Sequence, residues 1–454
     1  MVRISTAKRK TLKPHQERGV DYLCRNPHGA LFMEMRLGKT LTAIRALRRQ
    51  GIFELVLIVS PYSVMDAWEN ELRDDGIDCQ VLRGTREQRL EELKRKGEVP
   101  GWVVSNFESA ERLGLQTFRW QAVIVDESTR IANPRASVTK FFLRNFQAVP
   151  NKFILCGNPA PESGMQYATQ FMFLHGRFLG YYSFWTFRLK CYEQRGFDWK
   201  PKPGTTEDVA QYVRENSFEL SRKEAGMGGE KIFSVRRVSM SDEQIKQYKA
   251  MTNEFSFGDV EVKHVVAQLV SLQYICGGLS VESDHAMIGD AKLKELHCLL
   301  KNELSGQKVL VWCRFRAEQA AICQFLTEHG ISNYFINGDT DDRENVRQLF
   351  FSPASTSSNV VVMTIAAGAK GGDWSAADTA IYYSNFWSND LRSQSEDRIF
   401  HPEKTTPSLI VDLCLEDSID EDVLEMLREK KFSSEALLGR LECQIKMRSH
   451  HGQN

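Results

Sequence analysis

Short apolar runs rich in β-branched residues recur along this chain, and helix-periodic segments separate them. Five lie in the first half, at residues 30–35, 54–60, 101–106, 122–127 and 152–157, and five in the second half, at 308–313, 333–338, 359–364, 379–384 and 408–414. Continuous apolar strands that alternate with helices are typical of parallel sheets covered on both faces. Two groups of strands predict an α/β fold with two tandem, doubly wound parallel-sheet lobes.

Residues 165–285, between the two groups, have a different pattern. The stretch 173–204 is aromatic and basic, and two helical patterns follow at 241–251 and 262–275, the first opened by Ser241 as a helix cap. We therefore predict a helical, aromatic-rich insertion between lobes at about 1–225 and 226–454. A further helical pattern at 418–446 predicts C-terminal helices and a short tail.

Composition limits the classes of partner. Lys plus Arg and Asp plus Glu both number 59, which excludes a heavily basic binder and requires any nucleic-acid site to be a local patch. No apolar run approaches the roughly 20 residues of a membrane span, so we expect no membrane partner. Ten cysteines without a Cys-x-x-Cys pair predict neither a disulfide framework nor a zinc site.

The segment MEMRLGKT (33–40) carries phosphate-binding chemistry, because a predicted strand runs through Gly38, Lys39 and Thr40 into a helical pattern. Glycine lets backbone N–H groups approach a phosphate, and the helix N-terminus offers partial positive charge. Lys39 would contact the β- and γ-phosphates, and the Thr40 hydroxyl would bind magnesium. The full pattern has glycine where this chain has Met33, so a chance Gly-Lys-Thr at a helix start is the alternative.

The run VIVDE (123–127) ends a predicted buried strand with two acids. Asp126 can hold magnesium there, and Glu127 can polarise an attacking water. The alternative is an ordinary capped strand end. Both motifs in this order predict a nucleoside triphosphatase.

Nearly the whole chain resembles the Swi/Snf-like ATPases of helicase superfamily two, the superfamily of the DEAD/DEAH-type helicases. LKPHQERGVDYL resembles the opening segment in which Gln16 would contact adenine. The segments similar to motifs I, Ia, Ib, II and III are 34–40, 57–72, 103–109, 124–133 and 154–163. Those similar to motifs IV, V and VI are 308–326, 364–378 and 386–399.

The resemblance implies two RecA-like lobes with ATP and Mg²⁺ in the cleft between them. The catalytic residues would be Lys39, Asp126, Glu127, Gln394 and the arginine finger Arg398. Thr40 and Asp126 would hold the metal. The nucleotide contacts would be Gln16, Arg36, Leu37, Gly38, Lys39, Thr40, Leu41, Gly371 and Asp373.

Several positions depart from the family pattern. Arg36 stands in place of a glycine and Thr129 in place of a histidine, and motif III has CGNP (156–159) where TGTP is usual. His401 replaces the second arginine of motif VI. Arg398 and His401 are three residues apart, which would place them on one helical face. Alternatively His401, directly before Pro402, only ends the helix.

The resemblance implies an ATP-dependent motor that translocates along or remodels DNA, with duplex DNA favoured over single strands. Backbone phosphates would be contacted from Tyr62, Asn106, Arg314 and Lys370. For Arg314 an ordinary solvated arginine is the equal alternative. The tryptophans at 68, 102 and 120 fall within helical or strand patterns and are expected in the core.

Three other functions stay open at this point: a strand-separating DNA or RNA helicase, a nucleotide-sensing DNA-binding clamp, and a motor subunit of a nuclease or restriction complex. Replication, recombination or restriction proteins are the expected protein partners. The modest length suggests the cytoplasm of a bacterium or of a phage-infected cell rather than a nucleus.

Overall fold

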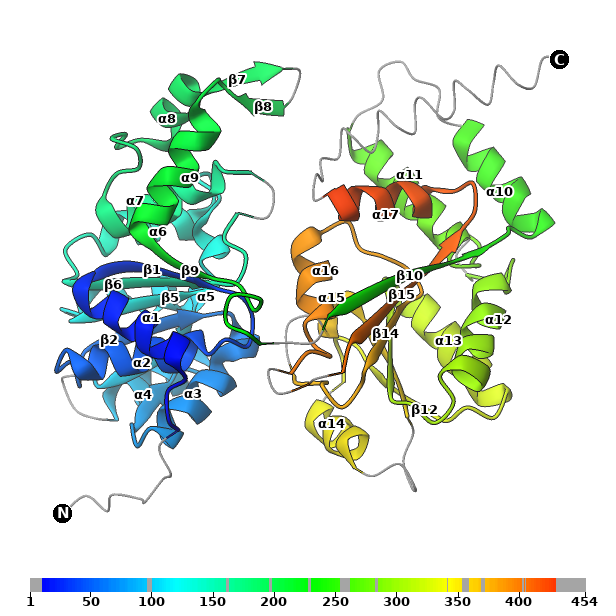
Figure 1. Ribbon diagram of the computed structural model, residues 1–454, viewed down its shortest axis with the longest axis horizontal. Helices are drawn as coiled ribbons and strands as arrows, with labels where there is room; N and C mark the ends of the chain where they lie inside the picture. The colour runs from blue at the N-terminus through cyan, green and yellow to red at the C-terminus, as the bar shows by residue number, and fades with distance from the viewer. Residues whose placement is uncertain are drawn as a thin grey trace. The chain divides into compact units, whose positions relative to one another are not determined.

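The structure is a computed structural model that describes residues 10–95, 100–160, 163–195, 198–227, 230–253, 262–281, 285–340, 342–352, 359–368, 372–401, 404 and 406–429. The chain divides into two compact units, Met1–Met227 and Gly228–Asn454 (Figure 1). Each unit is built around its own parallel sheet.

The first unit contains a seven-stranded sheet in the order β3-β4-β2-β5-β6-β1-β9, with every neighbouring pair parallel. The five strands predicted in the first half are present as β1, β2, β4, β5 and β6. The strands of this sheet are β1 (His28–Met33), β2 (Val56–Ser60), β3 (Cys79–Val81), β4 (Trp102–Asn106), β5 (Ala122–Asp126), β6 (Asn151–Cys156) and β9 (Ser217–Leu220).

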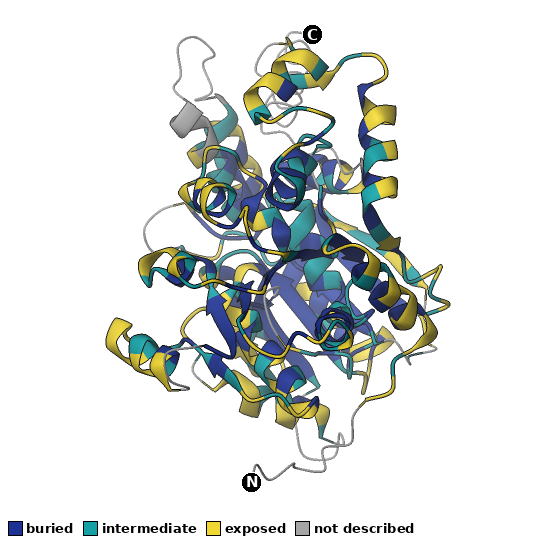
Figure 2. Cartoon of the chain, turned by 90° about the vertical axis from the view of Figure 1, so that its left-hand side faces the viewer, coloured by how far each residue is buried: buried dark blue, intermediate teal, exposed yellow. Residues whose placement is uncertain are grey.

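Successive side chains of a strand point to opposite faces of the sheet, and in the first sheet both sets are apolar. Helices therefore cover both faces. Val123 and Val125 of β5 enter one core with aromatic residues of α6 and α7, whereas Ile124 enters the other core with α1, α2 and α3. Figure 2 shows the buried strands between helices that are exposed on their outer sides. The helices are α1 (Pro14–Arg25), α2 (Lys39–Arg49), α3 (Met65–Asp74), α4 (Arg86–Lys94), α5 (Phe107–Arg112), α6 (Ser137–Asn145), α7 (Gln166–His175), α8 (Phe184–Cys191) and α9 (Thr205–Asn216), with short 3-10 turns η1 (Tyr62–Val64), η2 (Leu115–Thr117) and η3 (Ser128–Ile131).

The second unit contains a six-stranded parallel sheet in the order β10-β15-β14-β11-β13-β12. The five strands predicted in the second half are present as β11 to β15. The strands are β10 (Lys231–Val238), β11 (Val309–Cys313), β12 (Asn333–Ile336), β13 (Val360–Thr364), β14 (Thr379–Tyr382) and β15 (Ser408–Leu415).

The second sheet also has a core on each face. Val309 and Val311 of β11 pack with α12 and α13, whereas Leu310 and Trp312 pack with α14 and the residues around α15 and α16. A third cluster joins α10, α11 and α17 through Tyr248 and other buried side chains. The helices are α10 (Asp242–Asn253), α11 (Val262–Cys276), α12 (Ala291–Cys298), the π-helical turn η4 (Leu299–Glu303), α13 (Arg316–Glu328), α14 (Arg343–Phe351), α15 (Ile365–Gly368), α16 (Asn389–Glu396) and α17 (Ile419–Glu429).

The segment predicted as an insertion is shared between the two units. Its first part forms α7, α8, the antiparallel hairpin β7 (Tyr192–Arg195) and β8 (Asp198–Pro201), and α9, and ends in β9 beside β1. Its second part begins with β10, which pairs with β15, and continues into the two predicted helices, α10 and α11. Ser241 caps α10 as predicted, since its hydroxyl accepts a hydrogen bond from the Gln244 amide. The predicted helix at 418–446 is present as α17 up to Glu429, and its remainder lies outside the described residues.

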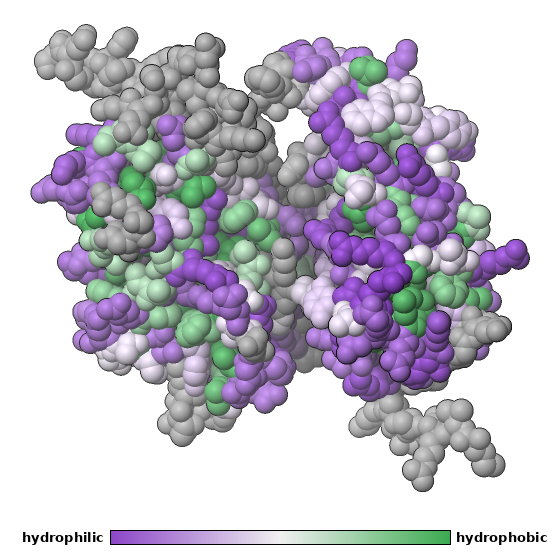
Figure 3. Space-filling model, turned by 180° about the vertical axis from the view of Figure 1, so that it is seen from behind, coloured by the Kyte–Doolittle hydropathy of each residue, from purple (hydrophilic) through white to green (hydrophobic). Residues whose placement is uncertain are grey.

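The surface seen in Figure 3 mixes hydrophilic and hydrophobic residues over both units. Scattered apolar side chains of this kind are normal on folded proteins and do not by themselves mark an interface. Among the helices that the structure describes, none is both long enough and apolar enough to span a bilayer.

Candidate active site

The carboxyl ends of β1, β6 and β5 lie side by side, because β6 pairs with β1 on one side and with β5 on the other. The loop after β1 leads to Gly38 and α2, and β5 ends at Asp126. Residues that are about 90 positions apart in the sequence therefore meet at one edge of the first sheet. This is the edge at which ligands bind in open α/β sheets.

The loop between β1 and α2 has two residues in the left-handed backbone region. Gly38 precedes α2 with φ of 83° and ψ of 37°, and Arg36 has φ of 66°. A Cβ atom at Gly38 would lie 2.0 Å from Nε2 of Gln16, so any other residue would have to displace that side chain in addition to adopting a strained backbone. Arg36 occupies a backbone conformation that favours glycine, which is the residue that the family resemblance expects there. Met33, in contrast, ends β1 with its side chain buried in the core.

Gln16 is held against this loop from α1. Its side-chain oxygen accepts a hydrogen bond from the Lys13 amide at 2.8 Å, and its amide nitrogen donates to the Leu37 carbonyl at 3.4 Å. His15 contacts the same carbonyl through Nε2 at 3.0 Å. The structure thus brings Gln16, Leu37 and Gly38 together, as the predicted nucleotide contacts require. Arg36 and Leu41 belong to the same loop and helix start.

Lys39 begins α2, and its ammonium group donates to the Met33 carbonyl at 2.8 Å. The loop is fixed from the far side by β9 and the residues after it. The Glu34 amide donates to the Leu220 carbonyl, and the Glu34 carboxylate accepts from both the backbone and the side chain of Arg222, each at 3.0 Å. The segment predicted as an insertion therefore supports the candidate phosphate loop.

Asp126 is buried at the end of β5, with 5% of its surface exposed. Its carboxylate accepts a hydrogen bond from Nε1 of Trp68 at 2.8 Å and another from the Glu127 amide at 3.0 Å. Burial raises the pKa of Asp126, and the Trp68 hydrogen bond, the charge of Lys39 and the Glu127 amide oppose this rise. The ammonium group of Lys39 in motif I is therefore among the charges that lie near the Asp126 carboxylate of motif II.

Glu127 follows with φ of 52°, which is unusual for a residue other than glycine. Strain of this kind is found where the surrounding structure holds a side chain in one position for a function. The Cys156 thiol, at the end of β6, lies 3.8 Å from the Glu127 carboxylate. A Cβ atom on the next residue, Gly157, would lie 3.6 Å from Nζ of Lys39. The motif III segment thus touches both motif I and motif II.

The donor set fits a nucleotide and a hard cation. Thr40 has no hydrogen-bond partner among the described residues, whereas the Thr42 hydroxyl donates to the Gly38 carbonyl at 3.0 Å. The hydroxyl of Thr40 and the carboxylate of Asp126 are oxygen ligands of the kind that magnesium prefers. Within the described parts of the chain, no group of three or more His, Cys, Asp or Glu side chains is placed to bind a metal by itself. A metal here would therefore need oxygens from phosphate and water in addition.

A buried polar network links motif II to motif III. The Ser128 hydroxyl donates to Oε1 of Gln170 at 2.6 Å, and Nε2 of Gln170 donates to the Pro159 carbonyl at 2.7 Å. Gln170 lies on α7, so one side chain of that helix joins the two motifs.

In the second unit, the structure brings the predicted motif V and motif VI residues together. An Arg398 guanidinium nitrogen donates to the Gly372 carbonyl at 3.2 Å, and the Trp374 amide donates to the Arg398 carbonyl at 3.1 Å. Asp373 lies between these contacts and accepts from the Ser375 amide. Gly371 and Lys370 lie outside the described residues, so their predicted contacts stay predictions.

The helical arrangement expected for Arg398 and His401 is wrong. Helix α16 ends at Glu396, and both residues follow it in non-helical backbone. The end of the helix is fixed from its buried side, where Arg392 forms ion pairs with Asp412 at 2.6 Å and with Glu396 at 2.8 Å. Gln394 stays on the helix and donates to Asp390 at 3.0 Å.

The residues predicted to contact nucleic acid differ in their surroundings. Tyr62 begins η1 just after β2 and is 57% exposed. Asn106 lies at the same edge, at the end of the neighbouring strand β4, where it caps α5 by accepting from the Ser109 amide at 3.2 Å. Tyr62 is thus available to a ligand, whereas Asn106 already has a structural role.

Arg314 follows β11, but its side chain turns into the second unit. Its guanidinium donates to Oε1 of Gln273 and lies 4.0 Å from the Trp387 ring centroid and 4.8 Å from that of Phe386. Burial lowers the pKa of Arg314 to about 10. The environment therefore supports neither of the two predicted roles for Arg314, phosphate contact or an ordinary solvated arginine.

Sequence reasoning missed Trp68, Arg222 and Gln170 as supports of the candidate site. The prediction that Trp68, Trp102 and Trp120 belong to the core is confirmed, since all three are at most 3% exposed. A buried tryptophan needs a partner for its N–H group, and this requirement was the one available signal for the Trp68 contact.

Comparisons with known proteins agree with this arrangement. The family model described as an SNF2-related domain matches residues 15–276, and the model of the helicase conserved C-terminal domain matches residues 291–402. The chain belongs to the SNF2-related family. The first match continues past Met227, so the family domain includes β10, α10 and all of α11, which belong to the second unit.

Curated relatives of this SNF2-related chain include the ISWI chromatin-remodeling complex ATPase ISW1 of Saccharomyces cerevisiae, which is 23% identical over 92% of this chain and 40% of its own length. Another is the ATP-dependent DNA helicase DDM1 of Arabidopsis thaliana, 24% identical over 94% of this chain and 62% of its own length. The chain thus spans between two fifths and two thirds of these relatives. A solved SWI2/SNF2 ATPase core of Sulfolobus solfataricus in complex with dsDNA is 17% identical over 94% of this chain and 93% of that chain, with a TM-score of 0.44.

Proposed function

We propose that this SNF2-related protein hydrolyses ATP and couples hydrolysis to movement along, or remodelling of, duplex DNA. The observation that supports this most strongly is the meeting of Lys39, Asp126 and Glu127 at one edge of the first sheet, beside the left-handed Gly38. The relatives' names support ATP as the nucleotide and DNA as the nucleic acid, since one relative is an ATPase and another an ATP-dependent DNA helicase. A bacterial or phage origin stays a prediction.

Each candidate residue of the first unit would have a separate role in ATP binding and hydrolysis. Lys39 would neutralise charge on the β- and γ-phosphates, and the N–H groups at the start of α2 would bind phosphate oxygens. Glu127 would orient the attacking water and accept its proton. Thr40 and Asp126 would hold Mg²⁺, which when bound withdraws charge from the phosphates. Gln16 would contact adenine through the side-chain amide that hydrogen-bonds to Lys13 and Leu37 in this structure.

In the second unit, Arg398 would stabilise charge on the transferred phosphoryl group, as the family resemblance implies. Its contact with the Gly372 carbonyl holds the side chain beside the motif V segment. His401 would add charge only when protonated, so Arg398 is expected to carry most of this role.

The test is steady-state ATP turnover without nucleic acid and then with single-stranded DNA, duplex DNA and RNA. Duplex DNA should stimulate turnover most. Lys39→Ala should lower turnover by orders of magnitude, whereas Lys140→Ala, which removes an exposed lysine of α6, should leave it unchanged. Glu127→Gln should bind ATP without hydrolysing it.

Two of the alternative functions correspond to distinct results in these experiments, and the third, a motor subunit of a nuclease or restriction complex, is tested by co-purification. Displacement of a paired strand would show a strand-separating helicase. Nucleotide binding without turnover on any nucleic acid would show a sensing clamp. Turnover in Lys39→Ala at the wild-type rate would exclude the assigned phosphate site.

A further inference from the structure

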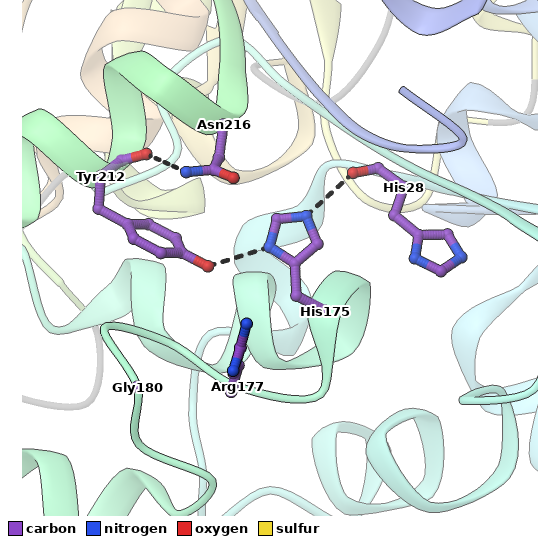
Figure 4. A pocket seen from close by; sticks show the side chains of 6 residues that line it. All are labelled: His28, His175, Arg177, Gly180, Tyr212 and Asn216. Atoms are coloured by element: carbon purple, nitrogen blue, oxygen red, sulfur yellow. Dashed lines mark hydrogen bonds between the residues drawn. The ribbon is translucent and has the colours of Figure 1, made fainter. Parts of the chain in front are cut away.

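A cavity of about 650 Å³ lies at the opposite edge of the first sheet from the candidate phosphate loop (Figure 4). His28, the first residue of β1, lines it, whereas the phosphate loop follows the last residue of β1. The other lining residues come from the ends of α7 and α9 and the loop after α7: His175, Arg177, Gly180, Tyr212 and Asn216. The cavity is therefore separate from the candidate active site.

The lining contains one arginine and two histidines but no carboxylate. Lys152, which pairs with His28 in the sheet, is a further buried cation and donates to the Phe173 carbonyl at 2.7 Å. Burial lowers the pKa of Lys152 to about 8, and burial followed by neighbouring positive groups lowers the pKa of both histidines. Positive charge is thus disfavoured here mainly by burial, and a bound anion would offset that cost.

The hydrogen bonds of His175 fix its tautomer. Nε2 lies 3.2 Å from the His28 carbonyl, which can only accept, so Nε2 carries the proton. In the neutral ring Nδ1 then accepts a hydrogen bond from the Tyr212 hydroxyl at 3.0 Å. The Tyr212 proton is therefore turned away from the cavity as long as His175 is neutral.

Arg177 has no hydrogen bond or ion pair among the described residues and is exposed. Figure 4 shows its side chain projecting toward the hydrogen bond between Tyr212 and His175. Asn216 holds the last turn of α9 by donating to the Tyr212 carbonyl at 2.8 Å, which fixes the wall opposite. The guanidinium thus faces a cavity whose other walls are already hydrogen-bonded.

We propose that this cavity binds a phosphate group, with Arg177 as its principal ligand and Tyr212 as a second donor. A guanidinium offers paired N–H groups whose spacing matches phosphate oxygens. If His175 gains a proton, Nδ1 donates to the Tyr212 oxygen, and the Tyr212 hydroxyl proton turns to the phosphate. One proton is then taken up at Nδ1 for each phosphate bound in this way.

The titratable and charged groups around His175 are His28 on β1, Lys152 on β6, Arg177 after α7 and Tyr212 on α9. All of them except the tyrosine are cations when protonated. Phosphate binding should therefore strengthen as the pH falls through the pKa of His175, which lies below the ordinary histidine value.

The phosphate could belong to a free phosphorylated ligand or to a nucleic-acid backbone. Residues 176–204 hold six Lys or Arg and two Asp or Glu in a chain whose formal charge is zero, which would suit either source. Two measurements on the full chain separate them. The first is calorimetric titration with inorganic phosphate at about pH 5.5 and about pH 8, and the second is the anisotropy of a labelled DNA duplex over a salt series.

Four variants test the assignment. Arg177→Ala should lower the affinity for phosphate about tenfold or more. Arg177→Lys keeps the charge and should lower that affinity less. Tyr212→Phe keeps the ring but removes the second donor, so phosphate binding should strengthen less at low pH than it does in the wild type. Arg144→Ala removes another exposed arginine, on α6, and serves as the control. Any phosphate that binds at Lys39 contributes equally to the titrations of all these variants, so differences between them report on the cavity alone.

Loss of phosphate binding in Arg177→Ala with an unchanged salt slope for DNA identifies a free ligand. A salt slope that falls by about 0.9, with or without loss of inorganic phosphate binding, identifies a nucleic-acid phosphate. If Arg177→Ala matches Arg144→Ala in both measurements, the proposal is wrong. A full pH dependence in Tyr212→Phe would overturn the coupling to His175. None of these readouts depends on ATP turnover, so they stand apart from the proposed function.

Discussion

Arg314→Ala is expected to destabilise the second unit rather than to weaken DNA binding selectively. The substitution leaves the buried Gln273 amide oxygen without its donor, which costs about 1–3 kcal/mol. It also removes the guanidinium from the rings of Trp387 and Phe386, at 4.0 and 4.8 Å, where each partly desolvated contact contributes about 1 kcal/mol. The free energy of unfolding should fall by about 4 kcal/mol in total.

Urea unfolding followed by circular dichroism measures this effect. With a slope of about 3 kcal/mol per molar urea for a unit of this size, the midpoint of its transition should fall by about 1 M. Arg314→Lys keeps the charge but not the planar group, and should lose about half as much. Arg316→Ala is the matched control. It removes an exposed arginine two positions further along, at the start of α13, whose side chain is ion-paired with Asp339.

DNA affinity supplies the decisive comparison for Arg314. Under conditions where both variants are folded, Arg314→Ala should bind a DNA duplex no more weakly than Arg316→Ala. An unchanged unfolding midpoint together with several-fold weaker DNA binding would refute the packing role and restore Arg314 as a phosphate contact.

Three further substitutions test other contacts. Trp68→Phe removes the donor to Asp126 but keeps an aromatic ring, so ATP turnover should fall about tenfold or more in a phosphate-release assay; unchanged turnover would show that the contact is only packing. Lys292→Met leaves the buried Asp420 without the cation that lies 2.5 Å from it, so the free energy of unfolding measured in urea should fall by about 3–5 kcal/mol. Adding Asp420→Leu removes the unpaired charge and should restore most of that free energy. Burial holds the pKa of Lys152 at about 8, below the 10.5 of an unperturbed lysine. The unfolded chain therefore binds more protons between these values, and the contribution of Lys152 to stability should rise with pH across that window; Lys152→Met should lack the rise in unfolding midpoints measured from about pH 7.5 to 10.5.

The strands flanked by others could be predicted from the sequence, and several edge strands could not. All ten apolar runs form strands, because a strand buried on both faces needs an apolar residue at nearly every position. β9 has four residues, and β10 exposes Ile232 and Phe233 to solvent. β9 and β10 pair on one side only and lack such a run, so the sequence predicts an insertion there, whereas the apolar run at 333–338 predicts the edge strand β12.

The candidate site was predictable to the same limited extent. Local motifs identify Lys39 and Asp126, because strand ends and helix starts have sequence signatures. Their supports come from elsewhere in the chain: Arg222 reaches Glu34 across 188 positions, and Trp68 reaches Asp126 across 58. No spacing rule connects such pairs, and the packing of the fold alone brings them together.

The two edge strands also set the order in which the chain can fold during synthesis. β9 pairs with β1, whose Ala30 lies opposite Ser217, and β10 pairs along its whole length with β15, from Lys231 opposite Ser408 to Val238 opposite Leu415. At a ribosomal rate of about 5–20 residues per second, β10 emerges roughly 10 to 35 seconds before its partner. Throughout that interval β10 has no strand beside it, so the described sheet of the second unit is completed only after β15 has been synthesised.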